Sequence, residues 1–269
     1  MIETALVKNL RLVVLDIDGT TIDAHPNRAV SGRLTRAVDA LRLHGVHVCP
    51  ATGRSLSSLV EEPSLGTLSL GDLAVVSAGG AIADLTNRTI LWYEPISTSS
   101  IARIYAILEP LRYECYFYND YSEDLFLSGG VHLPDPNISP LYFLGAARVI
   151  PAHIPIITAG LDEIDDINYV ITRGLHRPFH ELHVTHKNAT KHHATTRMQE
   201  LLGASHSTSV GVGDGHNDLD LFRAVGLKVA MDNAVAELKD AADLVIGHVG
   251  SDSLARFLED LLAQYVRAV

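Results

Sequence analysis

Two aspartates spaced two residues apart carry the clearest chemical signal in the sequence. Asp16 and Asp18 follow an apolar run, and in an extended segment this spacing places both carboxylates on one face. Two neighbouring negative charges need a counter-charge, which a hard divalent cation with oxygen ligands supplies. One aspartate can act as the nucleophile in phosphoryl transfer, while the other protonates the leaving alkoxide and then activates water. The pair therefore predicts phosphoryl-transfer chemistry.

Other polar residues follow predicted strands further along the chain. Asp214, Asn217 and Asp218 add oxygen ligands, and this set favours Mg²⁺, which takes few protein carboxylates and accepts phosphate oxygen. Thr52 offers a hydroxyl to a phosphate oxygen, and a lysine between residues 187 and 191 offers a positive charge. Because ligands of open α/β sheets bind beyond the carboxyl ends of the strands, we expect these side chains to converge.

The elements that must position these residues alternate between strand and helix at both ends of the chain. Strands are predicted at 10–15, 46–50, 73–77, 207–212, 227–231 and 243–246, a hairpin at 82–93, and helices at 31–45, 189–203, 217–225, 234–241 and around 254–261. This alternation predicts an α/β fold with a doubly wound, Rossmann-like parallel core sheet covered by helices on both faces.

The middle of the chain has a different pattern and predicts an inserted α+β cap domain. We expect a first part of the core at 1–92, the cap at 93–182 and a second part of the core at 183–269. Within the cap, the pattern indicates a helix at 99–111, strands at 113–118, 125–127 and 168–172, and a proline-rich loop near 130–140. The cap aromatics Tyr116, Phe117, Tyr118 and Tyr121 are candidates to line a pocket, although strand alternation turns about half of them into the core.

Composition limits the classes of partner. The 269 residues carry a net charge of −11, which disfavours general affinity for nucleic acid or anionic membrane. The sequence contains no run of about 18 apolar residues, so it predicts no membrane-spanning helix. Its two cysteines are too few for a disulfide framework. We expect a soluble cytoplasmic protein without a cleaved signal, a monomer or homodimer, acting on a small molecule.

Four ordered motifs resemble those of the haloacid dehalogenase (HAD) superfamily of aspartyl-phosphate phosphatases. The motifs are Asp16-Ile17-Asp18-Gly19-Thr20, Ala51-Thr52-Gly53-Arg54, Thr190-Lys191 and Gly213-Asp214-Gly215-His216-Asn217-Asp218. The resemblance covers roughly residues 10–92 and 183–247, and the insertion resembles the type IIB cap of many sugar and small-metabolite phosphatases. The second acid of the first motif argues against the dehalogenases and P-type ATPases of the superfamily.

The resemblance implies a role for each motif residue. Asp16 would be the nucleophile and Asp18 the general acid and base, with Thr52 and Lys191 as catalytic phosphate ligands. Substrate would also meet Gly53 and Arg54. The Mg²⁺ site would comprise Asp16, Asp18 through its backbone carbonyl, and Asp214, with support from Asn217 and Asp218.

The function that follows is that of a Mg²⁺-dependent phosphomonoesterase, a hydrolase acting on a small phosphorylated metabolite, with a sugar or polyol phosphate as the expected substrate. The mechanism would pass through an aspartyl-phosphate. A phosphomutase of the same family, which would need a bisphosphorylated intermediate, is the alternative enzyme. A non-catalytic phosphometabolite-binding protein is the alternative from another class.

Two departures from the family pattern bear on the site. Where relatives often have Asn-Gly-Ala, this chain has Gly79-Gly80-Ala81, which removes an amide that could contact substrate. The third motif lacks its usual glycine pattern and contains a second lysine, so Lys187 remains the alternative to Lys191.

Six histidines lie within eighteen residues: His176, His180, His183, His186, His192 and His193. Their spacing matches no compact zinc pattern. A solvated surface is the simplest interpretation, and a contact from one of them to substrate is the functional alternative.

Overall fold

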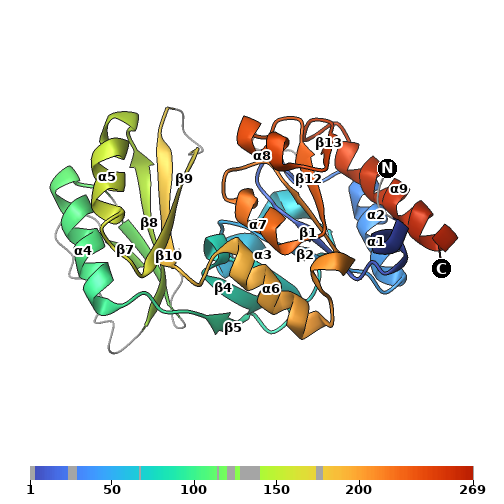
Figure 1. Ribbon diagram of the computed structural model, residues 1–269, viewed down its shortest axis with the longest axis horizontal. Coiled ribbons are helices and arrows are strands. Elements are labelled where there is room, and N and C mark those ends of the chain that lie inside the picture. The colour runs from blue at the N-terminus through green and yellow to red at the C-terminus, as the bar shows by residue number, and fades with distance from the viewer. Residues whose placement is uncertain are drawn as a thin grey trace.

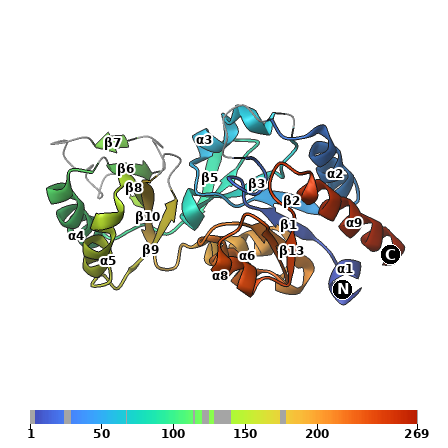
Figure 2. The same cartoon turned by 90° about the horizontal axis from the view of Figure 1, so that it is seen from above.

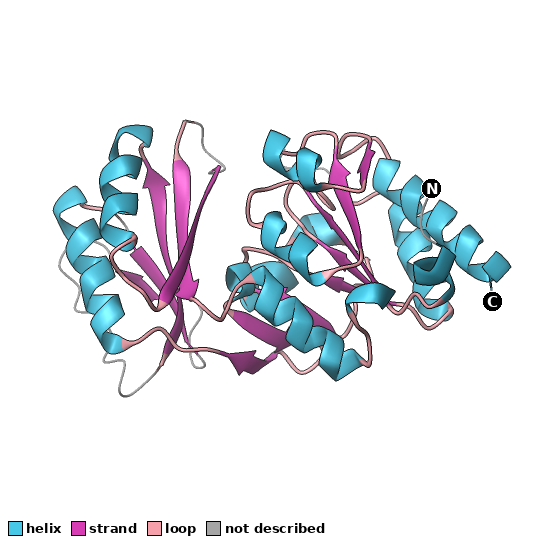
Figure 3. Ribbon diagram, in the orientation of Figure 1, coloured by secondary structure: helices cyan, strands magenta, loops and turns pink. Residues whose placement is uncertain are grey.

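The computed structural model describes residues 4–23, 29–66, 68–113, 115–119, 125–127, 140–173 and 178–268. Two lobes lie next to each other along the long axis, and both termini lie at the far end of one of them (Figure 1). Each lobe combines a sheet with covering helices (Figure 3).

The lobe that holds both termini is built on a five-stranded parallel sheet. Its order is β13-β12-β11-β1-β2, with bounds β1 Leu12–Leu15, β2 His47–Pro50, β11 Ser209–Gly213, β12 Leu227–Met231 and β13 Leu244–Ile246. Strands from the two ends of the chain thus pair directly, with β1 between β11 and β2. The predicted α/β class with a doubly wound core sheet is confirmed.

Alternation along β1 explains why helices cover both faces of this sheet. Val13 and Leu15 pack into one apolar cluster, whereas Leu12 and Val14 pack into another on the opposite face. The first face is covered by α2 (Gly32–Leu43) and α9 (Ser253–Ala268), and the second by α6 (Lys191–Leu202) and α7 (Asp218–Ala224) (Figure 2). The remaining helices of this lobe are α1 Thr4–Lys8, α3 Leu56–Val60 and α8 Ala236–Ala241, with short 3₁₀ turns at Pro63–Leu65, Ser77–Gly79 and His206–Thr208.

The third predicted strand is present but belongs to a separate sheet. β3 (Leu73–Val76), β4 (Ala81–Asp84) and β5 (Thr89–Tyr93) form an antiparallel meander, and among the described residues β3 meets the parallel sheet through one bridge, Ala51 to Val75. The backbone after β3 turns sharply, with positive φ angles at Ser77 and Ala78. That turn folds β4 back onto β3.

The other lobe contains an antiparallel sheet with two helices on its outer face (Figure 1). The strand order is β7-β6-β8-β10-β9, with bounds β6 Cys115–Asn119, β7 Leu125–Leu127, β8 Leu141–Val149, β9 Ile167–Arg173 and β10 His180–His186. The helices are α4 Thr98–Leu108 and α5 Ile154–Leu161, each preceded or followed by a 3₁₀ turn, Glu109–Leu111 after α4 and Pro151–His153 before α5.

Sequence reasoning missed β8, β10 and α5. Most of β8 is buried on both faces, so its apolar residues do not alternate with polar ones. Pro151 and Pro155 break no helix, because they lie in the first turns of a 3₁₀ helix and of α5, where a missing N–H costs no hydrogen bond.

The two faces of the antiparallel sheet have different partners. Phe117 packs into the cluster beneath α4 and α5, whereas Tyr116 and Tyr118 belong to the cluster that extends into the other lobe. Tyr121, His176 and residues 130–139 lie outside the described residues. β10 runs across residue 182, and the predicted domain division remains a prediction. None of the described helices is long and apolar enough to cross a membrane.

Candidate active site at the carboxyl edge of the parallel sheet

The predicted site residues converge where neighbouring parallel strands end. Asp16 directly follows β1, Thr52 lies two residues beyond β2, and Asp214 directly follows β11. Because β1 pairs with both other strands in parallel, these positions share one edge of the sheet. A cavity of about 460 Å³ opens there and is also lined by residues of the antiparallel sheet.

Lys191 links two of the predicted aspartates. Its Nζ donates to Oδ1 of Asp16 and to Oδ1 of Asp218, each at 2.7 Å, and its side chain is 0% exposed. The lysine is the first residue of α6, whose N-cap Thr190 accepts from the backbone N–H of His192. Lys187, by contrast, is exposed. The structure therefore brings Lys191, and not Lys187, to the aspartates.

Asp218 anchors the loop that carries Asp214. Its Oδ2 accepts the backbone N–H groups of Asp214 and Gly215 at 3.0 and 2.9 Å, while its Oδ1 accepts from Lys191. A side chain at Gly213 would overlap the Asp218 carboxylate. Both oxygens of Asp218 thus hold the loop and the lysine in place.

Three carboxylates form the candidate metal group. Oxygens of Asp16, Asp214 and Asp218 lie within 4.8 Å of one another, and this is the one such group among the described residues. The donor set fits a hard divalent cation. The Asp218 oxygens accept hydrogen bonds of 2.7 to 3.0 Å from Lys191 and from the loop backbone, whereas those that Asp214 accepts are longer, at 3.2 and 3.3 Å. The contacts therefore favour Asp16 and Asp214 as the direct ligands and Asp218 as their support.

The charges of this group are strongly coupled. Burial, and then the charge of Asp218, raises the pKa of Asp16 well above its usual range. The same two causes raise the pKa of Asp214 to about 7. Burial lowers the pKa of Lys191, but the charges of Asp16 and Asp218 outweigh it and raise the pKa overall. Three carboxylates with one lysine leave excess negative charge, which favours capture of a proton or a cation.

Asp18 is bound by an arginine of the second motif. Arg54 donates from Nε to Oδ2 of Asp18 at 2.8 Å and from Nη2 to Oδ1 at 2.7 Å. Its Nη1 donates to Oε2 of Glu62 at 2.5 Å. The hydrogen bonds with Asp18 raise the already high pKa of Arg54, so its guanidinium group stays positively charged.

The remaining predicted residues differ in exposure to the cavity. Gly53, Arg54 and Asn217 line it together with Asp16, Asp18 and Asp214. Thr52 is completely buried, and its hydroxyl accepts the backbone N–H of Arg54 at 3.1 Å. Thr52 therefore shapes the loop that presents Arg54.

Sequence reasoning missed Asn233, which stands two residues beyond β12. Its Nδ2 donates to the carbonyl of Gly19 at 2.8 Å and to Oδ2 of Asp214 at 3.3 Å, and it accepts from the N–H of Val249 at 2.9 Å. It thereby ties together three loops of the site. Its place just after a predicted strand was the available signal.

Gly79 has a structural explanation. Its φ is +98°, and a Cβ at this position would overlap the backbone of Thr190 and Lys191. The turn between β3 and β4 thus packs directly against the start of α6, and a larger residue has no room. The glycine allows the approach that positions Lys191.

Two histidines line the cavity, His183 on β10 and His216 in the fourth motif. The metal group found among the described residues contains carboxylates and no histidine. The position of His183 in the cavity therefore favours a contact to substrate, and not metal binding, as the function of this histidine.

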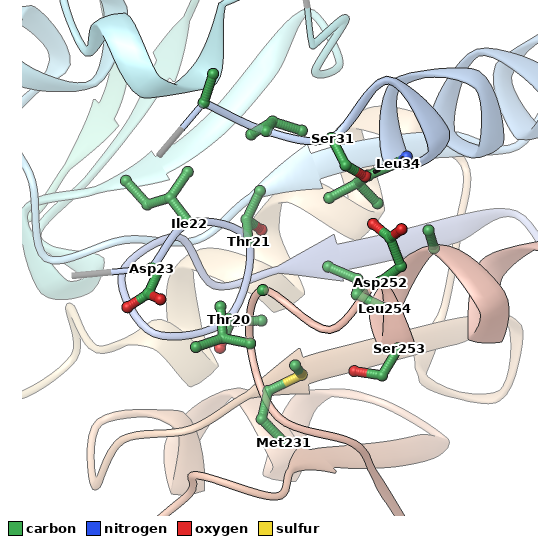
Figure 4. Close-up of a pocket in the computed structure, with 15 residues that line it drawn as sticks. Thr20, Thr21, Ile22, Asp23, Ser31, Leu34, Met231, Asp252, Ser253 and Leu254 are labelled. Carbon is green, nitrogen blue, oxygen red and sulfur yellow. Dashed lines mark hydrogen bonds between the residues drawn. The ribbon is translucent and has the colours of Figure 1, made fainter. Parts of the chain in front are cut away.

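A second, smaller cavity of about 240 Å³ lies behind the turn that follows β1. Figure 4 shows Thr20, Thr21 and Asp23 on this turn, and Ser31 and Asp252 on the segments that line the other side of the cavity. None of the predicted site residues lines this cavity, so the chemistry is concentrated in the larger one.

The chain is similar to known phosphatases along most of its length. The chain is 28% identical over 254 residues to the phosphoglycolate phosphatase of Methanopyrus kandleri, covering 94% of this chain and 97% of that protein. It is 22% identical over 288 residues to the 5-amino-6-(5-phospho-D-ribitylamino)uracil phosphatase of Bacillus subtilis, covering 94% and 99%.

The fold is shared with a solved subclass IIB sugar phosphatase of the HAD superfamily. The TM-score is 0.73 at 18% identity, covering 93% of this chain and 98% of that one. The sequence profile of the haloacid dehalogenase-like hydrolases matches residues 13–128 and 161–258. The family expected from the four motifs is thus confirmed, and the chain belongs to the haloacid dehalogenase-like hydrolases.

Proposed function

We propose that this hydrolase is a Mg²⁺-dependent phosphomonoesterase that acts on a small phosphorylated metabolite through an aspartyl-phosphate on Asp16. The observation that carries the proposal is the position of Lys191 Nζ, 2.7 Å from both Asp16 and Asp218. A buried cation at this point restrains the attacking carboxylate and stabilises charge on a transferring phosphoryl group. Phosphatase names of relatives that match along most of their length support the same activity.

The reaction would proceed in two displacements. A carboxylate oxygen of Asp16 attacks phosphorus, the bond to the leaving oxygen breaks, and Asp18 gives that oxygen its proton. Asp18 then takes a proton from water, whose oxygen attacks the phosphorus of the aspartyl-phosphate. Inorganic phosphate leaves and the carboxylate of Asp16 is restored.

Asp16 and Asp214 would hold the Mg²⁺, with Asp218 supporting them. The ion would offset the negative charge of the carboxylates and of the incoming phosphate. Arg54 would keep Asp18 in position, because its two hydrogen bonds fix the carboxylate plane.

We also propose that residues 93–182 act as the cap. The support is that Tyr118 and Glu181 line the same cavity as Asp16 and Asp18. A cap over the site excludes bulk water and meets the part of the substrate that is not phosphate.

The test is phosphate release from p-nitrophenyl phosphate and a panel of metabolite phosphates, with Mg²⁺ or with EDTA. We expect release only with Mg²⁺, and a loss of at least about a thousandfold in kcat for Asp16→Asn. Thermal unfolding should show that Asp16→Asn is folded, because the substitution removes one of three neighbouring negative charges. Retained turnover in folded Asp16→Asn would refute the nucleophile, and activation by an added bisphosphate would favour a phosphomutase.

A further inference from the structure

The antiparallel sheet presents a polar wall to the cavity that the proposed reaction does not use. The wall consists of Tyr116 and Tyr118 on β6, Ala147 on β8, Thr172 on β9, and Glu181 and His183 on β10. Alternation places these side chains on the face opposite Phe117 and Leu182, which pack beneath the helices. The wall therefore faces the part of a substrate that extends from its phosphate.

A glycine of β8 determines how Tyr116 lies on this wall. Gly145 pairs with Tyr116 on one side and with His183 on the other. A Cβ at Gly145 would overlap the Tyr116 ring and come within 2.6 Å of its hydroxyl oxygen. Because Gly145 has no side chain, the Tyr116 ring can lie across β8. Its hydroxyl end then lies over β8, the strand between β6 and β10.

Glu181 places a carboxylate on the same wall. Its Oε2 lies 3.4 Å from Nε2 of His183, and its side chain is 31% exposed. Burial, followed by the charge of Glu181, raises the pKa of Tyr116, so the phenol remains a neutral hydrogen-bond donor. The wall thus combines a charged acceptor with a neutral donor.

His183 brings this wall against the core. It is buried, and its Nδ1 has no hydrogen-bond partner among the residues that the structure describes. Its Cε1 lies 3.1 Å from the position that a Cβ of Gly53 would take, and its ring packs against Phe143 with centroids 5.3 Å apart. A buried imidazole nitrogen thus lies beside the second motif, next to the cavity that His183 lines.

The positive charge in the described lining of the cavity is already paired. Arg54 is the one lysine or arginine among the described residues that line the cavity. Its guanidinium is bonded to Asp18 and to Glu62. A second anionic group on a substrate would therefore approach the Glu181 carboxylate without an unpaired guanidinium to offset it.

We propose that Glu181 is a specificity-determining residue that selects phosphate esters of neutral, hydroxyl-rich alcohols over esters whose alcohol part carries a second negative charge. A carboxylate accepts hydrogen bonds from hydroxyl groups and repels anions, so it both favours one class and rejects the other. The inference rests on the proposed phosphatase function, whose substrate class it narrows.

Two substrates of the same carbon skeleton test the proposal. sn-Glycerol 3-phosphate carries a neutral hydroxymethyl group where 3-phosphoglycerate carries a carboxylate. Their inhibition constants against Mg²⁺-dependent hydrolysis of p-nitrophenyl phosphate give a selectivity ratio even where their own turnover is slow. We expect the wild-type protein to prefer sn-glycerol 3-phosphate by at least about tenfold.

Variants assign that preference to the residue. Glu181→Gln should reduce the ratio by about tenfold, whereas Glu181→Asp, which keeps the charge, should retain most of it. Glu109→Gln is the matched control, because it removes the same charge from an exposed position at the end of α4. Thermal unfolding of each variant verifies the fold.

The outcomes separate this inference from the proposed function. An unchanged ratio in folded Glu181→Gln, a wild-type preference for 3-phosphoglycerate, or equal inhibition by both compounds, including none by either, would overturn the inference. Absence of Mg²⁺-dependent hydrolysis of p-nitrophenyl phosphate would instead overturn the proposed function.

Discussion

Arg54 binds both carboxylate oxygens of Asp18, at 2.8 and 2.7 Å. A bidentate pair fixes the plane of the carboxylate as well as its position. Glu62 holds the far side of the guanidinium, so the arginine is itself oriented. The proposed general acid is therefore held by two side chains in sequence, Arg54 of the second motif and Glu62 of the loop after α3.

Replacing Arg54 with lysine should separate positioning from substrate binding. Arg54→Lys keeps a positive charge but loses the planar fork, and we expect kcat to fall by about tenfold to a hundredfold because Asp18 is less well oriented. KM for p-nitrophenyl phosphate should change little. A raised KM at unchanged kcat would instead assign Arg54 to substrate binding, as the sequence predicted. The exposed Arg197→Lys serves as the control.

Replacing Lys191 should affect both activity and stability. Lys191→Met leaves Asp16 and Asp218 buried without their shared cation, and we expect a loss of about 3–5 kcal/mol in the free energy of unfolding without metal. Phosphate release should fall strongly. Urea unfolding and turnover measure the two effects, and Lys187→Met, at an exposed position, is the matched control. Greater loss in the control would reassign the third motif.

The affinity for Mg²⁺ should depend on pH near neutrality. Burial and the charge of Asp218 raise the pKa of Asp214 to about 7, so below this pH a proton competes with the metal for the same carboxylate. We expect the apparent Kd, measured by calorimetry, to rise as pH falls from 8 to 6. A pH-independent Kd over this range would show that Asp214 is not a ligand. Asp214→Asn should weaken Mg²⁺ binding at every pH.

Alanine at Gly79 tests the contact between the β3–β4 turn and α6. Gly79 and Gly45 both have positive φ angles, of 98° and 77°, but only Gly79 has neighbours within 4 Å of the added Cβ. Gly45→Ala should cost about 1 kcal/mol of unfolding free energy through backbone strain alone. Gly79→Ala should cost more than about 3 kcal/mol because the start of α6 must move. Equal losses of unfolding free energy in the two variants, measured with urea, would show that the β3–β4 turn can shift without moving Lys191.

The sequence by itself determined the core fold and predicted most of the residues that converge at the candidate site. Short apolar runs separated by helical periodicity predicted every strand of the parallel sheet, because buried strands and amphipathic helices leave local patterns. Asp16 and Asp18 were found for the same reason, since their spacing and their place after a strand are local properties. The order of the four motifs then identified the family.

Only the tertiary structure decided the contacts between segments far apart in the chain. The bonds from Lys191 to Asp16 and Asp218, from Arg54 to Asp18 and from Asn233 to Gly19 join loops that no local pattern relates. The same holds for β8, whose burial on both faces hides its alternation. It holds for Glu181 as well, because a carboxylate on a strand acquires a role only when the other lobe closes a cavity around it.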